Sequence, residues 1–231
     1  NADRVNLDEA LEAAGYTLDA TMKGIYDVIM ADFTETTRYG NTTITYNNGY
    51  VTSPGDMKDY QVREVPPSRY TEANLGNAAS DWKSKIDKAS TVAICVFARG
   101  AGESNTYAPG SAKDFAGNKT GEDPLALSVD ELAVINAAKE TSSRVIVLLN
   151  TGNTMEIGKI AKGGSHEVDA IGYMGIINDY QSTGIVQVLS GEYNATGALP
   201  DTYAYSNLSS PAMMNFGGTY FEDYRLGESI G

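Results

Sequence analysis

Apolar runs alternate with amphipathic segments along the second half of the chain. Three segments have the composition of buried strands, namely 91–98, 144–150 and 167–175. Between and after them, residues 128–143 and 179–193 show the helical periodicity of apolar side chains. Strands that alternate with helices at this spacing predict βαβ crossovers. The expected fold is therefore α/β, a three-layer sandwich with a mostly parallel sheet and helices on both faces.

Several positions in these segments predict how the elements begin and pack. Ser128 and Glu131 have the spacing of an N-terminal capping box, so a helix is expected to start there. Cys95, the single cysteine, stands in the middle of the first strand and is expected to be a small buried hydrophobe.

The first part of the chain carries other patterns. Helical spacing predicts short helices within 5–15 and 20–33. Threonine and tyrosine residues alternate in 41–53 with the two-residue period of a strand. The pair Asn48-Gly49 then predicts a hairpin turn.

A further helix is expected to run to about Lys88 and to contain Trp82. We expect residues 1–90 to be helices and a hairpin packed on the same domain. Residues 91–205 would form the sandwich core, and 206–231 an extended link toward another domain.

The charge balance restricts the possible partners. The chain has 231 residues with 30 acidic and 17 basic side chains, a formal net charge of −13. This excess of negative charge argues against nucleic acid and against an anionic membrane surface, whereas a neutral partner such as a sugar remains open. No apolar run approaches the roughly 18–20 residues of a membrane span, so membrane insertion is not expected.

The count of reactive side chains restricts the chemistry. With one histidine, His166, neither a Ser-His-Asp triad nor a multi-histidine metal site is expected, and no acidic cluster has metal-ligand spacing. No cofactor is predicted. The cysteine count leaves the redox compartment, and hence the localisation, open.

The glycine-rich segment after the first strand is the candidate site. It contains Arg99 and Glu103. In open parallel sheets ligands bind beyond the carboxyl ends of strands, which is where these two side chains are expected, on an exposed loop. A dinucleotide fingerprint is incomplete here, because Asn105 occupies the place of its third glycine.

Four segments, taken in order, resemble the α/β-sandwich domain of glycoside hydrolase family 3, which contains β-glucosidases and β-xylosidases. They are VAICVFARGAGES with its Arg-x-x-Gly-Glu pattern, the stretch 125–157, the stretch 173–205 with its closing Gly-x-Leu-Pro turn, and 213–231. The first 90 residues match this pattern poorly.

The resemblance implies a retaining β-glycosidase (β-glucosidase-like) that hydrolyses terminal β-linked sugars of an oligosaccharide or glycoside. Glu103 matches the general acid/base of the family. The nucleophile is implied to be an aspartate on a separate barrel domain of the same polypeptide, which this chain does not resemble. Arg99 would brace the loop or contact a sugar hydroxyl, and Tyr107 is the aromatic residue best placed to stack on a sugar ring.

One departure from the family pattern leaves alternatives open. Family members commonly carry an Asp-Arg pair after the glutamate, whereas this chain continues Ser-Asn-Thr. The acidic pair Glu122-Asp123 could supply the acid in place of Glu103. The other reading is a carbohydrate-binding or structural module without catalytic activity.

Overall fold

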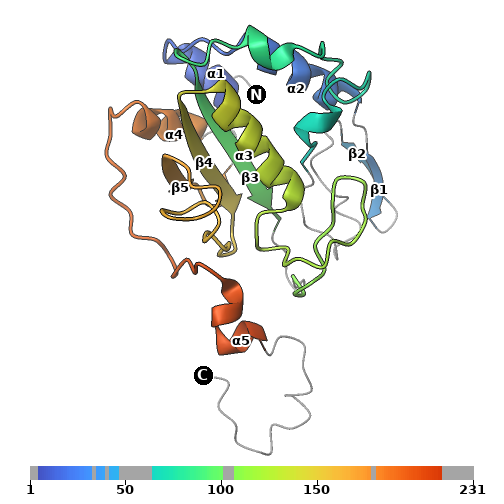
Figure 1. Ribbon diagram of the computed structural model, residues 1–231. Helices are drawn as coiled ribbons and strands as arrows, with labels where there is room; N and C mark the ends of the chain where they lie inside the picture. Colours follow the sequence, from blue (N-terminus) through green and yellow to red (C-terminus); the bar gives the residue numbers. More distant parts are fainter. Residues whose placement is uncertain are drawn as a thin grey trace, which may run out of the picture.

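A parallel sheet forms the centre of the molecule (Figure 1). The structure, a computed structural model, describes residues 5–32, 35–39, 42–46, 64–100, 107–177 and 181–214. The sheet has the order β3-β4-β5, with β3 at Val92–Arg99, β4 at Arg144–Thr151 and β5 at Ala170–Tyr173. The predicted strands and their parallel pairing are confirmed.

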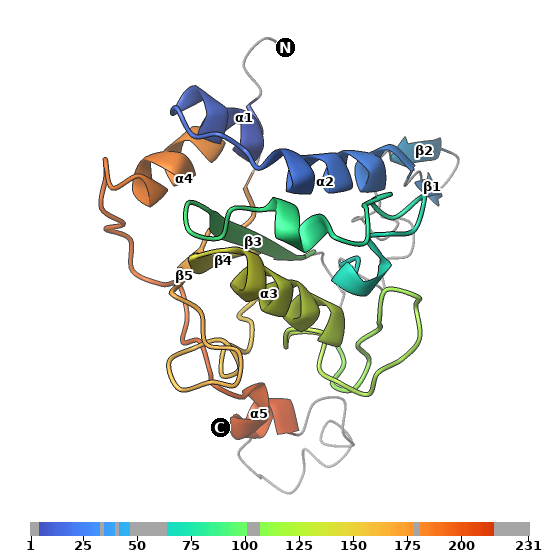
Figure 2. The ribbon, with the colours of Figure 1, turned by 45° about the horizontal axis from the view of Figure 1, so that its top comes forward.

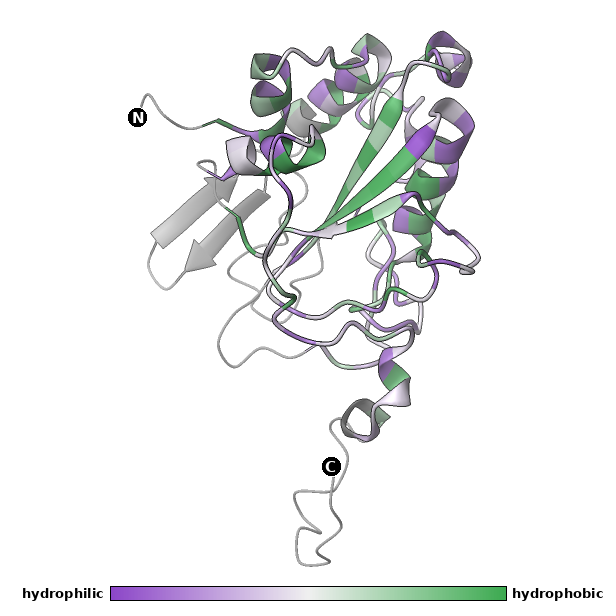
Figure 3. Cartoon of the chain, turned by 90° about the vertical axis from the view of Figure 1, so that its left-hand side faces the viewer, coloured by the Kyte–Doolittle hydropathy of each residue, from purple (hydrophilic) through white to green (hydrophobic). Residues whose placement is uncertain are grey.

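Helices lie on both sides of this sheet (Figure 3). Helix α3, Val129–Thr141, covers one face. Helices α1, Leu7–Ala13, and α4, Ser182–Leu189, contact each other on the opposite side (Figures 2 and 3). There Val92 and Val96 of β3 remain partly exposed. The predicted α/β fold class is thus confirmed.

The main hydrophobic core lies between the sheet and α3. Side chains alternate along a strand, and the odd-numbered residues of β3 and β4 face the helix. The buried members of this core are Cys95, Phe97, Leu127, Leu132, Ile135, Ala138, Val145, Val147, Leu149, Met155 and Ile160. Burial of each large apolar side chain contributes roughly 1.5–3 kcal/mol, so this interface fixes the strands on which the site is built.

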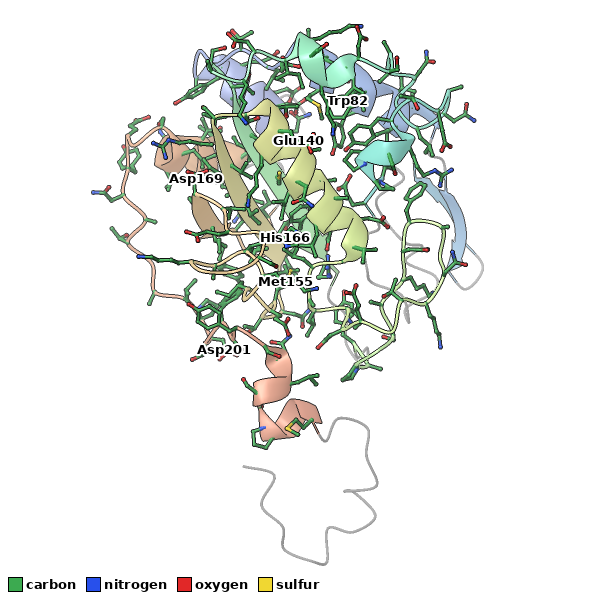
Figure 4. The ribbon with its side chains drawn as sticks, viewed as in Figure 1. Trp82, Glu140, Met155, His166, Asp169 and Asp201 are labelled. Carbon is green, nitrogen blue, oxygen red and sulfur yellow. The ribbon has the colours of Figure 1, made fainter. Side chains whose placement is uncertain are left out.

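A second core joins α2, Ala20–Asp32, to the segment 64–86 and to Ala137 of α3. The ring centroids of Tyr70 and Trp82 lie 5.5 Å apart within it. Figure 4 shows Trp82 near the amino ends of the strands, and Met155 and Asp201 near their carboxyl ends.

The helix predicted to run to Lys88 is absent from the described segment 64–100. That part forms two short 3₁₀ turns, η1 at Pro67–Arg69 and η2 at Trp82–Lys85. Between them Gly76 has φ 126°, where a side chain would meet the carbonyl oxygen of Tyr70 at 2.7 Å. Asn77 follows with φ 48°. Two consecutive residues in the left-handed region cannot continue a right-handed helix.

An antiparallel strand pair includes part of the segment 41–53. Strand β2, Thr42–Tyr46, pairs antiparallel with β1, Glu35–Tyr39, which precedes it. The predicted turn at Asn48-Gly49 lies outside the described residues.

The described part of the chain ends beyond the carboxyl edge of the sheet. The short helices η3, Asn207–Ser209, and α5, Pro211–Met214, lie there (Figure 1). Among the described helices, none has the length and apolar character to cross a membrane.

Candidate functional site

Arg99 is the last residue of β3 and stands at the carboxyl edge of the sheet. It is 2% exposed, so the expectation of an exposed loop position is wrong. The reason is strand alternation: position 99 shares its face with Cys95 and Phe97, so the side chain points into the α3 side of the sheet. Cys95 is buried as predicted.

All five N–H groups of the Arg99 guanidinium have partners within the protein. Nη1 and Nη2 donate to the two carboxylate oxygens of Glu131 at 2.6 and 2.8 Å. The other three N–H groups donate to the carbonyl oxygens of Ala98, Pro124 and Ala126. No N–H group remains for a sugar hydroxyl, so the bracing role fits this geometry and direct sugar contact does not.

The Arg99 guanidinium stays charged in spite of its burial. Burial by itself would lower the pKa of Arg99, but the charge of Glu131 and its hydrogen bonds outweigh that effect and raise the pKa. A bidentate guanidinium–carboxylate pair also fixes orientation, because both planar groups must lie in register.

Glu131 additionally forms the predicted capping box of α3. Its Oε2 accepts a hydrogen bond of 2.8 Å from the backbone N–H of Ser128, whose hydroxyl oxygen accepts one from the N–H of Glu131. The sequence marked Glu131 as a capping residue. Its second partner, Arg99, is 32 positions away, and no local pattern indicates that pairing.

Glu103 lies in 101–106, outside the described residues, but both ends of that segment are described. The Tyr107 hydroxyl donates to the carbonyl oxygen of Gly100 at 2.8 Å. The side-chain amide of Asn153 donates to the same oxygen at 3.2 Å. Gly100 is thus joined to Tyr107 and to Asn153 at the carboxyl end of β3.

Asn153 is a residue that sequence reasoning missed. Its backbone N–H donates to the hydroxyl of Thr151, the last residue of β4, at 2.9 Å. This short turn places the amide against Gly100, which follows the neighbouring strand β3. Its position two residues beyond the end of a buried strand was the available signal.

Glu122, the alternative acid, lies elsewhere on the same edge. Its Oε1 is 3.5 Å from Nζ of Lys159, and its backbone oxygen accepts from the N–H of Ala112. Within the described residues, Oε2 of Glu122 and Oδ2 of Asp123 are buried and lack a hydrogen-bond partner.

No metal centre accompanies these groups in the described part of the chain, where no three His, Cys, Asp or Glu side chains gather to bind an ion. The charged groups described at this edge include the buried Arg99–Glu131 pair and the partly buried Glu122 beside Lys159.

Three comparisons relate the chain to known proteins. The family described as "Glycosyl hydrolase family 3 C-terminal domain" matches residues 12–228. A β-glucosidase of Ruminococcus albus is 31% identical over 131 residues, which cover 56% of this chain and 12% of that protein.

Solved structures agree in fold. β-Glucosidase 3B from Thermotoga neapolitana in complex with glucose superimposes with a TM-score of 0.58 at 20% identity. Its complex with α-D-glucose gives a TM-score of 0.56. Both alignments cover 94% of this chain and 25% of the other.

The family match also corrects the extent of the resemblance. It begins at residue 12, so the segment before residue 91, which seemed to match poorly, is included. The chain spans a minor part of each relative's length. It belongs to glycosyl hydrolase family 3, as the C-terminal domain of that family.

Proposed function

We propose that this chain is the α/β domain of a retaining β-glycosidase and that Glu103 is its general acid/base. The substrate would be a β-glucoside-like molecule with a terminal β-linked sugar. The observation that supports the proposal is the hydrogen bond that joins Gly100 to Tyr107 at the carboxyl end of β3. Glu103 lies between these two residues in the sequence.

Retaining hydrolysis needs two carboxyl groups about 5–5.5 Å apart, one to protonate the leaving oxygen and one to attack the anomeric carbon. Glu103 supplies the first. The second belongs to a barrel domain of the same polypeptide. Glu103 is three positions after Gly100, and an extended chain spans at most about 3.3–3.6 Å per residue, so its Cα can lie up to about 10 Å from Gly100. That reach suffices for a pocket shared with a neighbouring domain.

Closure of such a pocket also provides the required protonation state. Removal of water from a carboxyl group disfavours its charged form and raises its pKa, so that it can donate a proton near neutral pH. Glu122 suits this role less well, because its carboxylate is already engaged by the ammonium group of Lys159.

The test compares two matched variants of the full-length enzyme, Glu103→Gln and Glu122→Gln. Each is assayed with an activated aryl β-glucoside and with an alkyl β-glucoside, whose leaving group needs a proton. We expect Glu103→Gln to lower kcat/KM for the alkyl substrate about 10²–10⁴-fold and for the aryl substrate far less. The same pattern in Glu122→Gln, with none in Glu103→Gln, would move the assignment to Glu122.

The Ser-Asn-Thr sequence after Glu103 favours a second candidate, a carbohydrate-binding module without catalytic activity. That reading predicts that the full-length protein binds a β-glucoside and does not turn it over. In that case Glu103→Gln would leave binding unchanged.

A further inference from the structure

Glu64 is a buried carboxyl group without a positive partner. It is 8% exposed, and its Oε1 accepts hydrogen bonds of 3.3 and 3.2 Å from the hydroxyl of Tyr26 and the backbone N–H of Val65. Both donors are neutral. Within the described residues, no lysine or arginine forms a salt bridge with Glu64. An uncompensated buried charge is costly, so the neutral acid is the form that fits this site.

The groups that face Glu64 come from several parts of the domain, and none of them neutralises a carboxylate. The titratable ones are the phenols of Tyr26 on α2 and Tyr70 after η1, the thiol of Cys95 on β3, and the carboxyl groups of Asp130 and Glu131 on α3. Burial raises the pKa of Glu64 most, and the charges of Glu131 and Asp130 add to this effect. Burial also raises the pKa values of Tyr70 and Cys95, so both stay uncharged where Glu64 titrates. The Arg99 guanidinium is bound to Glu131.

Helix α2 is held on the domain through this site and the apolar contacts around it. Its Ile25 and Ile29 are buried and pack against the segment 64–86 (Figure 2). Tyr26 donates to Glu64, and its hydroxyl oxygen lies 3.2 Å from that of Tyr70. When the helix moves away, the hydroxyl that contacts Glu64 leaves with it, and water reaches the carboxyl group.

The main core between the sheet and α3 does not depend on α2. Its buried members all lie between Cys95 and Ile160, so none belongs to α2 or to the segment 64–86. The second core touches α3 through Ala137. Parts of a protein with separate buried contacts can open separately, so α2 can leave while the sheet and α3 stay folded.

We propose that Glu64 is a pH-operated latch: as a neutral acid it keeps α2 docked, and its ionisation releases α2 while the sheet and α3 remain folded. The ionised group requires water, and the departure of α2 supplies it. The docked state therefore binds one proton more than the released state. Release becomes more favourable as pH rises from the ordinary glutamate pKa of 4.5 to the pKa of docked Glu64, about 8, and stays level above it. The latch does not depend on the role proposed for Glu103.

Hydrogen exchange of the full-length protein, followed by mass spectrometry of its peptides, tests the latch at about pH 5.5 and about pH 7.5. The peptides compared cover α2, Ala20–Asp32, and β4, Arg144–Thr151. Rates are converted to protection factors, which remove the pH dependence of the exchange chemistry itself. Glu64→Gln keeps the shape of the side chain and cannot ionise. The matched control is Glu72→Gln, which removes an exposed carboxylate from the same segment.

One proton over two pH units corresponds to about a 100-fold change in the docking equilibrium. We therefore expect the protection factors of α2 to fall about 100-fold from the lower to the higher pH in the wild type and in Glu72→Gln. In Glu64→Gln they should change less than about 3-fold. At both pH values α2 should be less protected than β4, because α2 opens without the main core.

Two results would overturn the latch. Protection of α2 that does not change with pH in the wild type, or that changes as much in Glu64→Gln, would show that the proton on Glu64 does not hold α2. Equal protection factors of α2 and β4 in the wild type at both pH values would show that the domain opens only as a whole. Glu64 would then affect global stability and release no helix.

Discussion

The hydroxyl of Tyr107 donates a hydrogen bond of 2.8 Å to the carbonyl oxygen of Gly100 and so joins the two described residues on either side of 101–106. Gly100 follows the buried Arg99, whose five donors hold the end of β3. The proposed acid/base Glu103 therefore lies in sequence between two residues that are joined to each other.

Two substitutions of Tyr107 separate its hydroxyl from its ring. Tyr107→Phe removes the hydrogen bond to Gly100 and keeps an aromatic face; we expect kcat for an alkyl β-glucoside to fall about 3–10-fold with little change in KM. Tyr107→Leu also removes the face that we propose to stack on a sugar, so KM should rise as well. Steady-state kinetics of the full-length enzyme measures both. Equal KM values in the two variants would contradict sugar stacking.

Glu64 makes the stability of the domain depend on pH. Burial, and after it the charge of Glu131, raises the pKa of Glu64 from its ordinary value of 4.5 to about 8. Its Oε1 accepts hydrogen bonds from the hydroxyl of Tyr26 and the N–H of Val65. Between these two pH values the folded protein holds a proton that the unfolded chain has released. The free energy of unfolding must therefore fall as pH rises through this window, and stay level above it.

The substitution Glu64→Gln removes this dependence. At about 1.4 kcal/mol per pKa unit, the variant should gain a few kcal/mol relative to wild type between pH 5 and pH 8.5. Denaturant unfolding at both pH values measures the gain. Glu72→Gln is the control. Glu72 is exposed, and its hydrogen bond to Arg69 lowers its pKa, so this carboxylate does not titrate between pH 5 and pH 8.5 and its replacement should not change the pH dependence of unfolding there. Equal pH dependence in wild type and Glu64→Gln would rule out the raised pKa.

A close backbone approach at Gly158 holds the C-terminal segment on the core. The N–H groups of Ile157 and Gly158 donate to the carbonyl oxygens of Ala204 and Tyr205, each at 3.1 Å. A methyl group at position 158 would collide with the Tyr205 carbonyl. We expect Gly158→Ala to cost about 1–3 kcal/mol of unfolding free energy and to expose both amides to hydrogen exchange. Gly197→Ala, with open space around it, should change neither.

The regular elements of the fold could be predicted because their signals are local. The strands over 91–98 and 144–150 and the capping box at Ser128 depend on apolar period and on spacings of a few residues. The prediction of a helix before Lys88 was wrong, because Gly76 and Asn77 have left-handed backbone conformations that end a helix. The apolar side chains of this segment are buried, but they project from turns.

The position of Arg99 at the carboxyl edge of the sheet could be predicted from the sequence, but its contacts could not. A parallel sheet by itself predicts a candidate site in the loop that follows the carboxyl end of β3. The burial of Arg99 does not, since arginine is mostly exposed and its partner Glu131 comes from a distant helix. An ion pair between residues far apart in the chain produces no periodic pattern in a single sequence.

The central claim, that Glu103 is the acid/base, is tested most directly by azide in the full-length Glu103→Gln variant. An activated aryl β-glucoside forms the covalent intermediate without a proton donor, but its hydrolysis then stalls because water lacks a general base. Azide is already an anionic nucleophile and needs no base. We predict that azide accelerates this variant at least about 10-fold and yields the β-glycosyl azide, while wild type and Glu122→Gln give none. Azide acceleration in Glu122→Gln, or its absence in Glu103→Gln, would contradict the assignment.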